Sequence, residues 1–249
     1  MSAAYDNYDY NAYWDNRSYE HESEVVAIRS FLNQIPTINK IVDIGAGFGR
    51  LTPDYAFRAK SVTLTEPSSK LLAIARKNLS ENKKINFVQS KIENLNDKFR
   101  NGSFDLAIMV RVAHHIKDLD MTFNSVSKLL TPSGYFIFEF ANKIHAKALI
   151  TNLAHGNLSY LTDVSPQDKS THKEKTLPFL NYHPKLVSEK LQKAGFKILE
   201  KRSVSNIRSP FLKKHIPISM LISLESKLQT SLSVINFGPS IFVLAKKME

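Results

Sequence analysis

The chain contains no cysteine among its 249 residues. This absence excludes disulfide bonds, thiolate zinc sites and cysteine nucleophiles. No apolar run approaches the roughly 20 residues that a membrane-spanning helix needs. The first residues, MSAAYDNYDYN, are polar and acidic and do not resemble a secretory signal. We therefore expect a cytoplasmic protein without a transmembrane segment.

Positive charge is in excess and is unevenly distributed. The formal net charge is +11, yet residues 1–30 hold six acids and two arginines and so carry −4, which leaves +15 on the rest of the chain. A basic body attracts nucleic acid, anionic lipid or an acidic small molecule. The lysines are scattered and not set in one run, which favours a solvated surface. Nucleic acid is therefore a conceivable partner but not the favoured one.

Short apolar runs alternate with segments of helical periodicity. The expected strands are residues 40–44, 61–65, 85–89, 104–110, 134–140, 196–203 and 240–246. The expected helices are residues 22–34, 49–59, 68–78, 119–130 and 184–194. Strands that alternate with helices indicate βαβ units and a parallel sheet covered on both faces. The sequence predicts an α/β fold and a single domain over residues 1–249.

Two stretches, residues 143–180 and 210–236, interrupt this alternation. The first contains an expected helix at 144–153 and then a polar loop. The second is amphipathic, with apolar residues such as Phe211 and Met220 set against Lys213 and Lys214. Insertions at such points commonly cover the ligand crevice beside the strand ends, so we expect two substrate-cap insertions. A membrane-surface role is an alternative for the second.

A glycine-rich turn, GAGFG, follows the first expected strand. Glycine adopts positive φ and lets a ligand approach the backbone closely, and Gly45, Gly47 and Gly49 stand at alternate positions. Glu66 ends the next strand 21 residues after Gly45. A carboxylate there can accept hydrogen bonds from two ribose hydroxyls. The pattern predicts a nucleoside cofactor, either a nicotinamide dinucleotide or an adenosyl compound.

Two neighbours of the turn bear on that choice. The dinucleotide pattern Gly-x-Gly-x-x-Gly wants a small residue where this chain has Arg50, whose bulk would obstruct a pyrophosphate over the expected helix start. Asp43, directly before the turn, places an acid where a ligand ammonium could be balanced.

Four ordered motifs resemble the class I S-adenosylmethionine-dependent methyltransferases, in particular the group that includes ubiquinone/menaquinone-type methyltransferases. They read VDIGAGFGR followed by LTEPS, FVQSKIENLN, FDLAIMVRVAHHI and LTPSGYFIFEFANK. The similarity covers about residues 13–140 and returns in HPKLVSEKLQKAGFKILE and GPSIFVLAKK. It implies a Rossmann-like three-layer sandwich, a seven-stranded and mostly parallel sheet in the order 3-2-1-4-5-7-6, and S-adenosyl-L-methionine as cofactor.

The resemblance also implies where the cofactor would lie. The glycine turn would pass under its methionine part, and Glu66 would hold its ribose. Lys91 stands where the family usually has an acid beside the adenine, so the backbone N–H of Ile92 would serve there. Main-chain carbonyls at the end of the fourth strand would receive the ammonium. The cofactor-binding residues implied in this way are Asp43, Gly45, Ala46, Gly47, Gly49, Glu66, Pro67, Lys91, Ile92, Glu93, Val110, Arg111, Tyr13 and Arg17.

An aromatic and basic segment near the N-terminus resembles the lid of similar enzymes, which predicts a lid over residues 1–21. Arg17 could pair with the cofactor carboxylate. Tyr13, Trp14 and Tyr19 could shield the sulfonium, because aromatic faces attract cations. Ordinary packing of these rings against the first helix is the alternative.

Methyl transfer from a sulfonium is an in-line displacement, so a base is needed only if the acceptor must lose a proton. His114 or His115 could serve, or could simply pack the loop after the fourth strand. Glu139 could orient an acceptor or be paired with Arg111. The other histidines show no metal-like spacing, and we expect no metal site.

The absence of a known acceptor motif bears on the class of methyl acceptor. The chain has Val110-Arg111-Val112-Ala113 where methylation of DNA amino groups usually needs Asp/Asn-Pro-Pro-Tyr/Phe. We therefore predict transfer to a small molecule, such as a quinone-like or lipid-like metabolite. The alternatives are a methyltransferase acting on RNA or protein, an NAD-dependent oxidoreductase, and a non-catalytic cofactor-binding scaffold. The sequence leaves the oligomeric state open.

Overall fold

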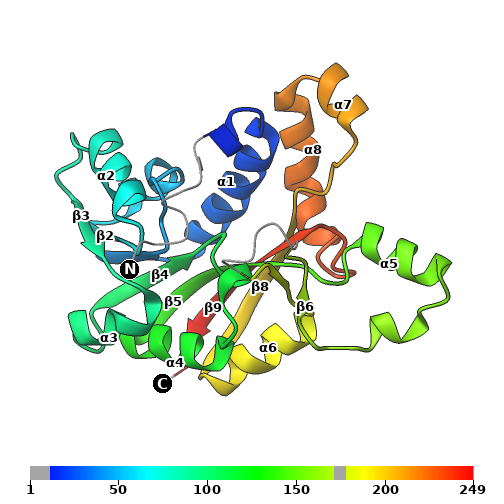
Figure 1. Cartoon of the computed structure of the whole chain (residues 1–249). Coiled ribbons are helices and arrows are strands. Elements are labelled where there is room, and N and C mark those ends of the chain that lie inside the picture. The colour runs from blue at the N-terminus through cyan, green and yellow to red at the C-terminus, as the bar shows by residue number, and fades with distance from the viewer. Residues whose placement is uncertain (1–11, 171–177, 249) are drawn as a thin grey trace.

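A computed structural model describes residues 12–170 and 178–248. Within them, a seven-stranded sheet carries helices on both faces (Figure 1). The strands are β1 (Lys40–Ile44), β2 (Ser61–Glu66), β3 (Ile85–Gln89), β4 (Phe104–Met109), β5 (Leu130–Ala141), β8 (Phe196–Val204) and β9 (Ser240–Lys247). Their order is β3-β2-β1-β4-β5-β9-β8, and only β9 runs antiparallel to its neighbours. Along the chain, β8 and β9 are the sixth and seventh strands of this sheet, so the predicted fold and the predicted order 3-2-1-4-5-7-6 are confirmed.

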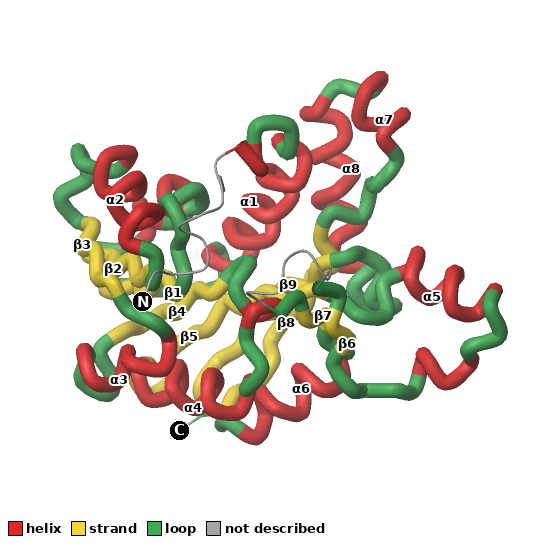
Figure 2. The backbone as a smooth tube through the Cα atoms, in the orientation of Figure 1, coloured by secondary structure: helices red, strands yellow, loops and turns green. Residues whose placement is uncertain are grey.

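The helices lie in two layers with the sheet between them (Figure 2). They are α1 (Ser18–Leu32), α2 (Ser69–Asn78), α3 (Leu95–Lys98), α4 (Leu119–Leu129), α5 (Ala146–Ala154), α6 (Pro184–Lys193), α7 (Pro210–His215) and α8 (Ile218–Ser231). In the view of Figure 1, α1, α2 and α8 cover the upper face and α3, α4 and α6 the lower one. A separate two-stranded pair, β6 (Gln167–Asp168) and β7 (Leu180–Asn181), belongs to the first insertion.

Apolar side chains on both faces of the central strands explain this layering. Ile41 and Val42 of β1 are both fully buried, one in the core under α1 and the other in the core over α4. The lower core is aromatic: the rings of Phe123 and Phe138 meet edge to face at 4.9 Å. Since both faces of these strands are covered, polar groups are left to the strand ends, and Asp43 and Glu66 lie there.

Local hydrogen bonds fix where the regular helices begin. Ser68 caps α2, because its Oγ accepts a hydrogen bond from the backbone N–H of Leu71 at 3.2 Å. Asp118 caps α4 in the same way, with the N–H of Met121 at 2.9 Å. The expected bounds of both helices hold to within one residue at each end.

The helix expected at 49–59 is wrong. The chain instead forms two 3₁₀ turns, Thr52–Asp54 and Ala56–Arg58. Gly49 has φ +77, which no α-helix contains, and Pro53 offers no backbone N–H to continue one. The glycine turn therefore does not open onto the start of an α-helix.

Two smaller differences concern the N-terminal segment and the membrane. Helix α1 begins at Ser18, four residues before the expected start, so residues 18–21 of the expected lid are helical. Residues 1–11 lie outside the described residues. Among the described residues, no helix combines the length and apolar character needed to cross a bilayer.

Candidate functional site

The glycine turn forms a tight bend at the carboxyl end of β1. Gly45, Gly47 and Gly49 have φ of +72, +58 and +77. The backbone N–H groups of Gly45 and Ala46 both donate to the carbonyl oxygen of Thr65, at 2.8 and 3.0 Å. A Cβ on Gly45 would overlap the side chain of Val112, which ties the turn to the loop after β4. The bend therefore needs glycine both for its conformation and for space.

A pair of alanine variants separates these two needs. Gly45 and Gly156 share a positive φ (+72 and +75), but a Cβ on Gly156 has no heavy atom within 4 Å. Both variants place an alanine in the left-handed region, which strains the backbone. Only the Cβ of Gly45→Ala also overlaps a neighbouring side chain, that of Val112. We expect Gly45→Ala to lose about 1–3 kcal/mol more free energy of unfolding than Gly156→Ala, measured by urea denaturation. Equal losses would contradict the contact with Val112.

Glu66 lies directly beside this turn. Its side chain is buried, and its carboxylate accepts the backbone N–H of Gly47 at 3.0 Å and that of Ser68 at 2.8 Å. Each oxygen of a carboxylate can accept more than one hydrogen bond. The carboxylate therefore joins the glycine turn to the start of α2, at the strand end where the sequence predicts a ribose.

Asp43 is buried below the turn. Its Oδ2 accepts the hydroxyl of Tyr55 at 2.5 Å. Burial raises the pKa of Asp43 to about 7, against the lowering effect of the hydrogen bond from Tyr55, and the nearby Glu66 carboxylate raises it further. The charged form is thus poorly stabilised by the protein alone, and a ligand cation nearby would favour it.

This pKa predicts a pH-dependent stability. A folded pKa of about 7 lies above the value of about 3.9 for an unfolded Asp, so the stabilising contribution is complete below pH 4 and is lost as pH rises through 7. An Asn cannot ionise and escapes that loss. The free energy of unfolding of Asp43→Asn should therefore rise relative to the unmodified protein between about pH 4.5 and about pH 8 in urea titrations. A difference that stays constant over this range would contradict the raised pKa.

The remaining predicted cofactor residues lie at neighbouring strand ends. Ile92 is buried in a 3₁₀ turn, while Lys91 and Glu93 on either side of it are exposed. Pro67 is half-buried, and its carbonyl accepts the side-chain amide of Gln89 at 3.0 Å. The order β3-β2-β1-β4 places the segments after these four strands side by side at one edge of the sheet.

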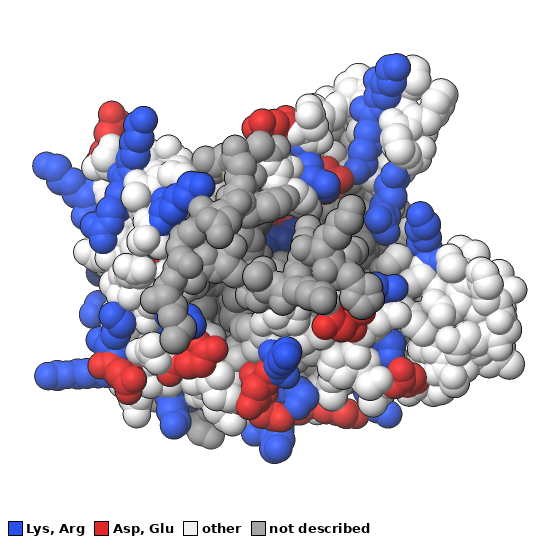
Figure 3. All heavy atoms as spheres, viewed as in Figure 1, with Lys and Arg blue, Asp and Glu red and all other residues white. Residues whose placement is uncertain are grey.

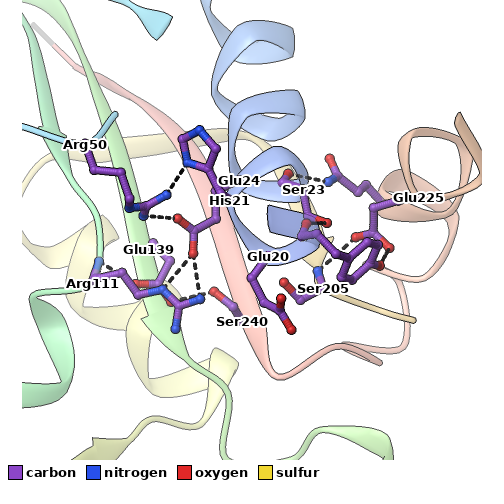
Figure 4. Close-up of polar contacts among 12 residues, drawn as sticks. Glu20, His21, Ser23, Glu24, Arg50, Arg111, Glu139, Ser205, Glu225 and Ser240 are labelled. Carbon is purple, nitrogen blue, oxygen red and sulfur yellow. Dashed lines mark hydrogen bonds and ion pairs between the residues drawn. The ribbon is translucent and has the colours of Figure 1, made fainter. Parts of the chain in front are cut away.

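An ion cluster that the sequence did not predict clamps two of these segments. Glu24 of α1 is fully buried, and its carboxylate pairs with Arg50 after the glycine turn at 2.5 Å and with Arg111 after β4 at 2.6 Å (Figure 4). Burial alone would raise the pKa of Glu24, but the guanidinium groups of Arg111 and Arg50 hold it below its ordinary value. The ring of Trp14 stacks on Arg50, with its centroid 3.4 Å from Cζ. A charged residue within the apolar stripe of α1, one turn before Ile28, was the available signal.

Arg111 has a strained backbone that a second acid supports. Its φ is +62, and its N–H donates to Glu139 Oε2 at 2.8 Å. Ser240 holds the other oxygen of Glu139 at 2.5 Å, and burial raises the pKa of Glu139. Glu139 thus contacts the main chain of Arg111, while Glu24 takes its guanidinium. Val110, just before it, is buried.

The aromatic residues of the expected lid divide into two groups. Arg17 lies over the ring of Tyr13, with Cζ 4.0 Å from the centroid. Tyr19, by contrast, is buried between α1 and α8, and its hydroxyl donates to Glu225 at 2.6 Å. The expectation that Tyr19 shields the sulfonium is therefore wrong, because the helical start at Ser18 turns this ring toward α8.

His114 and His115 form a 3₁₀ turn after β4, against the end of the first insertion. Their ring centroids are 3.9 Å apart, and the ring of Phe179 lies 4.6 Å from that of His114. His115 Nδ1 lies 2.8 Å from the carbonyl oxygen of Pro178. Burial lowers the pKa of both rings, that of His114 most strongly. Both are therefore neutral imidazoles near pH 7, and neutral imidazole can accept a proton.

With this geometry in place, comparison with known proteins identifies the family. Residues 42–138 match the family model described as a methyltransferase domain. A probable S-adenosylmethionine-dependent methyltransferase of Saccharomyces cerevisiae is 34% identical over 119 residues. The matched segment belongs to the S-adenosylmethionine-dependent methyltransferases. For this segment the predicted family is thereby confirmed, and with it S-adenosyl-L-methionine as the family's cofactor.

Other relatives of this methyltransferase domain carry more specific names. The ubiquinone biosynthesis O-methyltransferase of Pelagibacter ubique is 30% identical over 105 residues, which cover 42% of this chain and 42% of that protein. The yeast match covers 45% of this chain and 40% of that protein. The chain thus spans about two fifths of the length of these two relatives.

Solved structures agree with the methyltransferase fold over nearly the whole chain. A putative S-adenosylmethionine-dependent methyltransferase from Listeria monocytogenes superposes with a TM-score of 0.63 at 18% identity, covering 92% of this chain and 99% of that one. The N-methyltransferase NodS from Bradyrhizobium japonicum, in complex with S-adenosyl-L-homocysteine, gives 0.61 at 13% identity, covering 95% and 91%. At these identities the likeness establishes the fold.

Proposed function

We propose that this chain binds S-adenosylmethionine at the carboxyl ends of β1 to β4 and transfers its methyl group to a small-molecule acceptor. One observation carries the proposal. The glycine turn brings backbone N–H groups to the same point as the buried Glu66 carboxylate, and Gly47 and Glu66 are in direct contact. A bare backbone beside a carboxylate suits a ligand with vicinal hydroxyls and a polar tail.

The residues around this point fit the parts of the cofactor. We assign the ribose to Glu66 and the methionine part to the segment from Gly45 to Gly49. Asp43 lies below that segment, where its raised pKa would fall in response to a ligand cation. Pro67 and the segment 91–93 would flank the adenine, and the main-chain carbonyls of Val110 and Arg111 would receive the ammonium. When bound, the cofactor supplies an electrophilic methyl group on a sulfonium.

The lid and the insertions are proposed to exclude water from this site. Tyr13 and Arg17 lie on the segment that leads into α1, and Trp14 between them stacks on Arg50 beside the turn. Residues 143–180 and 210–236 are the proposed caps, and Phe179 and Pro178 already contact the histidine pair. Exclusion of water matters because the acceptor must approach in line with the sulfonium.

We propose His114 as the base for an acceptor that carries a proton. Its ring is buried and neutral, and no hydrogen bond to another described residue holds it. A positioned base contributes about 10²–10⁴-fold to the rate, so His114→Ala should lower kcat by about that factor while the affinity for S-adenosylhomocysteine stays unchanged. The exposed His155, replaced in the same way, is the matched control. An unchanged kcat would remove His114 from the chemistry.

The acceptor is proposed to be a quinone-like or lipid-like small molecule. Relatives named as ubiquinone biosynthesis O-methyltransferases support this class. RNA or protein acceptors remain the alternative that the basic charge suggests.

Two measurements test the proposal in sequence. Calorimetry with S-adenosylmethionine, S-adenosylhomocysteine and NAD should show binding of the first two, and binding of NAD alone would reject it. Transfer of labelled methyl from the cofactor into a cell extract should then depend on the protein. The labelled product identifies the acceptor, and an absence of transfer despite cofactor binding would favour a scaffold.

A further inference from the structure

The second insertion, residues 210–236, and the residues next to it form an arm, residues 208–237, whose outer surface is apolar and cationic. Helices α7 and α8 rise from the sheet beside α1 (Figure 1). The side chain of Phe211 on α7 is 68% exposed and that of Met220 on α8 is 62% exposed. Other large apolar side chains exposed on this arm are Leu212, Ile218, Leu224, Val234, Ile235 and Phe237.

Helix α8 is held firmly by its other face. Its buried positions are Leu221, Glu225 and Gln229, spaced one turn apart toward α1. Gln229 donates to the carbonyl oxygen of Ser23 at 2.8 Å, and Glu225 accepts the hydroxyl of Tyr19 (Figure 4). Met220, Leu224 and Lys227 lie on the faces turned away from α1, because helical positions three and four apart share a face. The arm therefore presents this stripe outward from a fixed support.

The charge of the arm has one sign. Residues 208–237 contain four lysines and arginines and a single acid, Glu225. That acid is buried and accepts the backbone N–H of Ser205 at 2.8 Å, so it does not offset the outward cations. Figure 3 shows Lys and Arg along the arm at the upper right. Lys213 pairs with Glu20 of α1, while Lys214 and Lys227 are exposed.

The first insertion adds a second exposed apolar arm, residues 146–161. None of the residues of α5 is buried, and Ile150 is 69% exposed. Leu158, in the turn after α5, is 72% exposed. Both arms project on the side of the molecule away from α2 and β3 (Figure 1).

We propose that the α7–α8 arm, assisted by the α5 arm, docks on an anionic lipid surface. Exposed apolar side chains beside exposed lysines, as on α7 and α8, are what an interfacial helix uses: the apolar groups enter the headgroup region and the lysines meet lipid phosphates. Nucleic acid would match the cations but leave Phe211 and Met220 in water. Docking on a lipid surface in this way does not depend on methyl transfer.

The test uses the full chain and sedimentation with vesicles. Vesicles of phosphatidylcholine with roughly 30% phosphatidylglycerol should bind the protein, pure phosphatidylcholine should bind it much more weakly, and salt should reduce binding. Reversal of two cations in Lys214→Glu/Lys227→Glu should weaken binding by about tenfold or more. Lys83→Glu/Lys84→Glu, exposed before β3 at the opposite edge, makes the same charge change and should bind as the unmodified protein does.

A second variant tests the apolar part. Phe211→Ser/Met220→Ser keeps every charge and should lose binding to the anionic vesicles as well, with unchanged circular dichroism and thermal midpoint to show that it folds. The proposal is overturned if neither vesicle binds. It is also overturned if the arm variants bind like the control. The same holds if light scattering shows a dimer that Phe211→Ser/Met220→Ser dissociates, because a second copy would then cover the arm.

Discussion

Replacement of Glu66 by alanine is expected to weaken S-adenosylhomocysteine binding by about 1–3 kcal/mol, or roughly 5- to 150-fold, in calorimetry. The loss has two sources. The proposed ribose contact disappears, and the buried N–H groups of Gly47 and Ser68 lose the carboxylate that holds the turn in shape. If the turn is less well ordered before binding, the free-energy cost of ordering it is subtracted from the binding free energy.

A matched set of variants separates these sources. Glu66→Gln retains one carbonyl oxygen that can accept the N–H of Gly47, so it should recover stability better than affinity. Glu81→Ala, an exposed acid after α2, should leave both unchanged. Unfolding in urea is measured beside binding for each variant. If Glu66→Ala kept full affinity, Glu66 would have no place in the cofactor site.

Replacement of Glu24 by glutamine is expected to give the largest loss of stability, about 3–5 kcal/mol. The amide cannot balance the two guanidinium groups, and the side chains of Arg50 and Arg111 are only 13% and 25% exposed. Uncompensated charge in such surroundings is costly. Because Arg50 and Arg111 flank the glycine turn and the end of β4, cofactor affinity should fall as well.

The pH dependence provides an independent readout for Glu24. Its pKa is lowered in the folded state, so its contribution is complete above the unfolded value of about 4.3 and is lost as pH falls below it. The stability difference between the unmodified protein and Glu24→Gln should therefore shrink on acidification. Glu22→Gln, exposed two residues away on the same helix, is the control. Equal losses of unfolding free energy in Glu24→Gln and Glu22→Gln would contradict the stabilising pairing of Glu24 with Arg50 and Arg111.

The strands were predictable because their residues carry the pattern themselves. Segments such as 40–44 and 85–89 are apolar runs bounded by polar turns, and their bounds agree with β1 and β3. After the glycine turn, the periodicity led to the wrong prediction of a helix, since Leu51, Tyr55 and Ala59 repeat at helical spacing. Those residues are buried, but they flank two consecutive 3₁₀ turns, because Gly49 and Pro53 forbid a continuous helix.

The candidate site was predictable where it is local and unpredictable where it depends on tertiary contacts. The turn and Glu66 follow from the distance along the chain between two adjacent strand ends. The Glu24 clamp joins α1 to residues 26 and 87 positions away, and no local pattern announces such a pairing. The partner of Tyr19 is farther still, at 206 positions, which is why its orientation was wrongly predicted.

Helix α1 is held on two sides by neighbouring residues. Glu24 forms ion pairs with the loops of the candidate site, while Ser23 and Tyr19 are hydrogen-bonded to α8. A rotation of α1 about its own axis would therefore have to break both sets of contacts together. Helix α1 thus joins the outer arm directly to the two arginines at the rim of the candidate site.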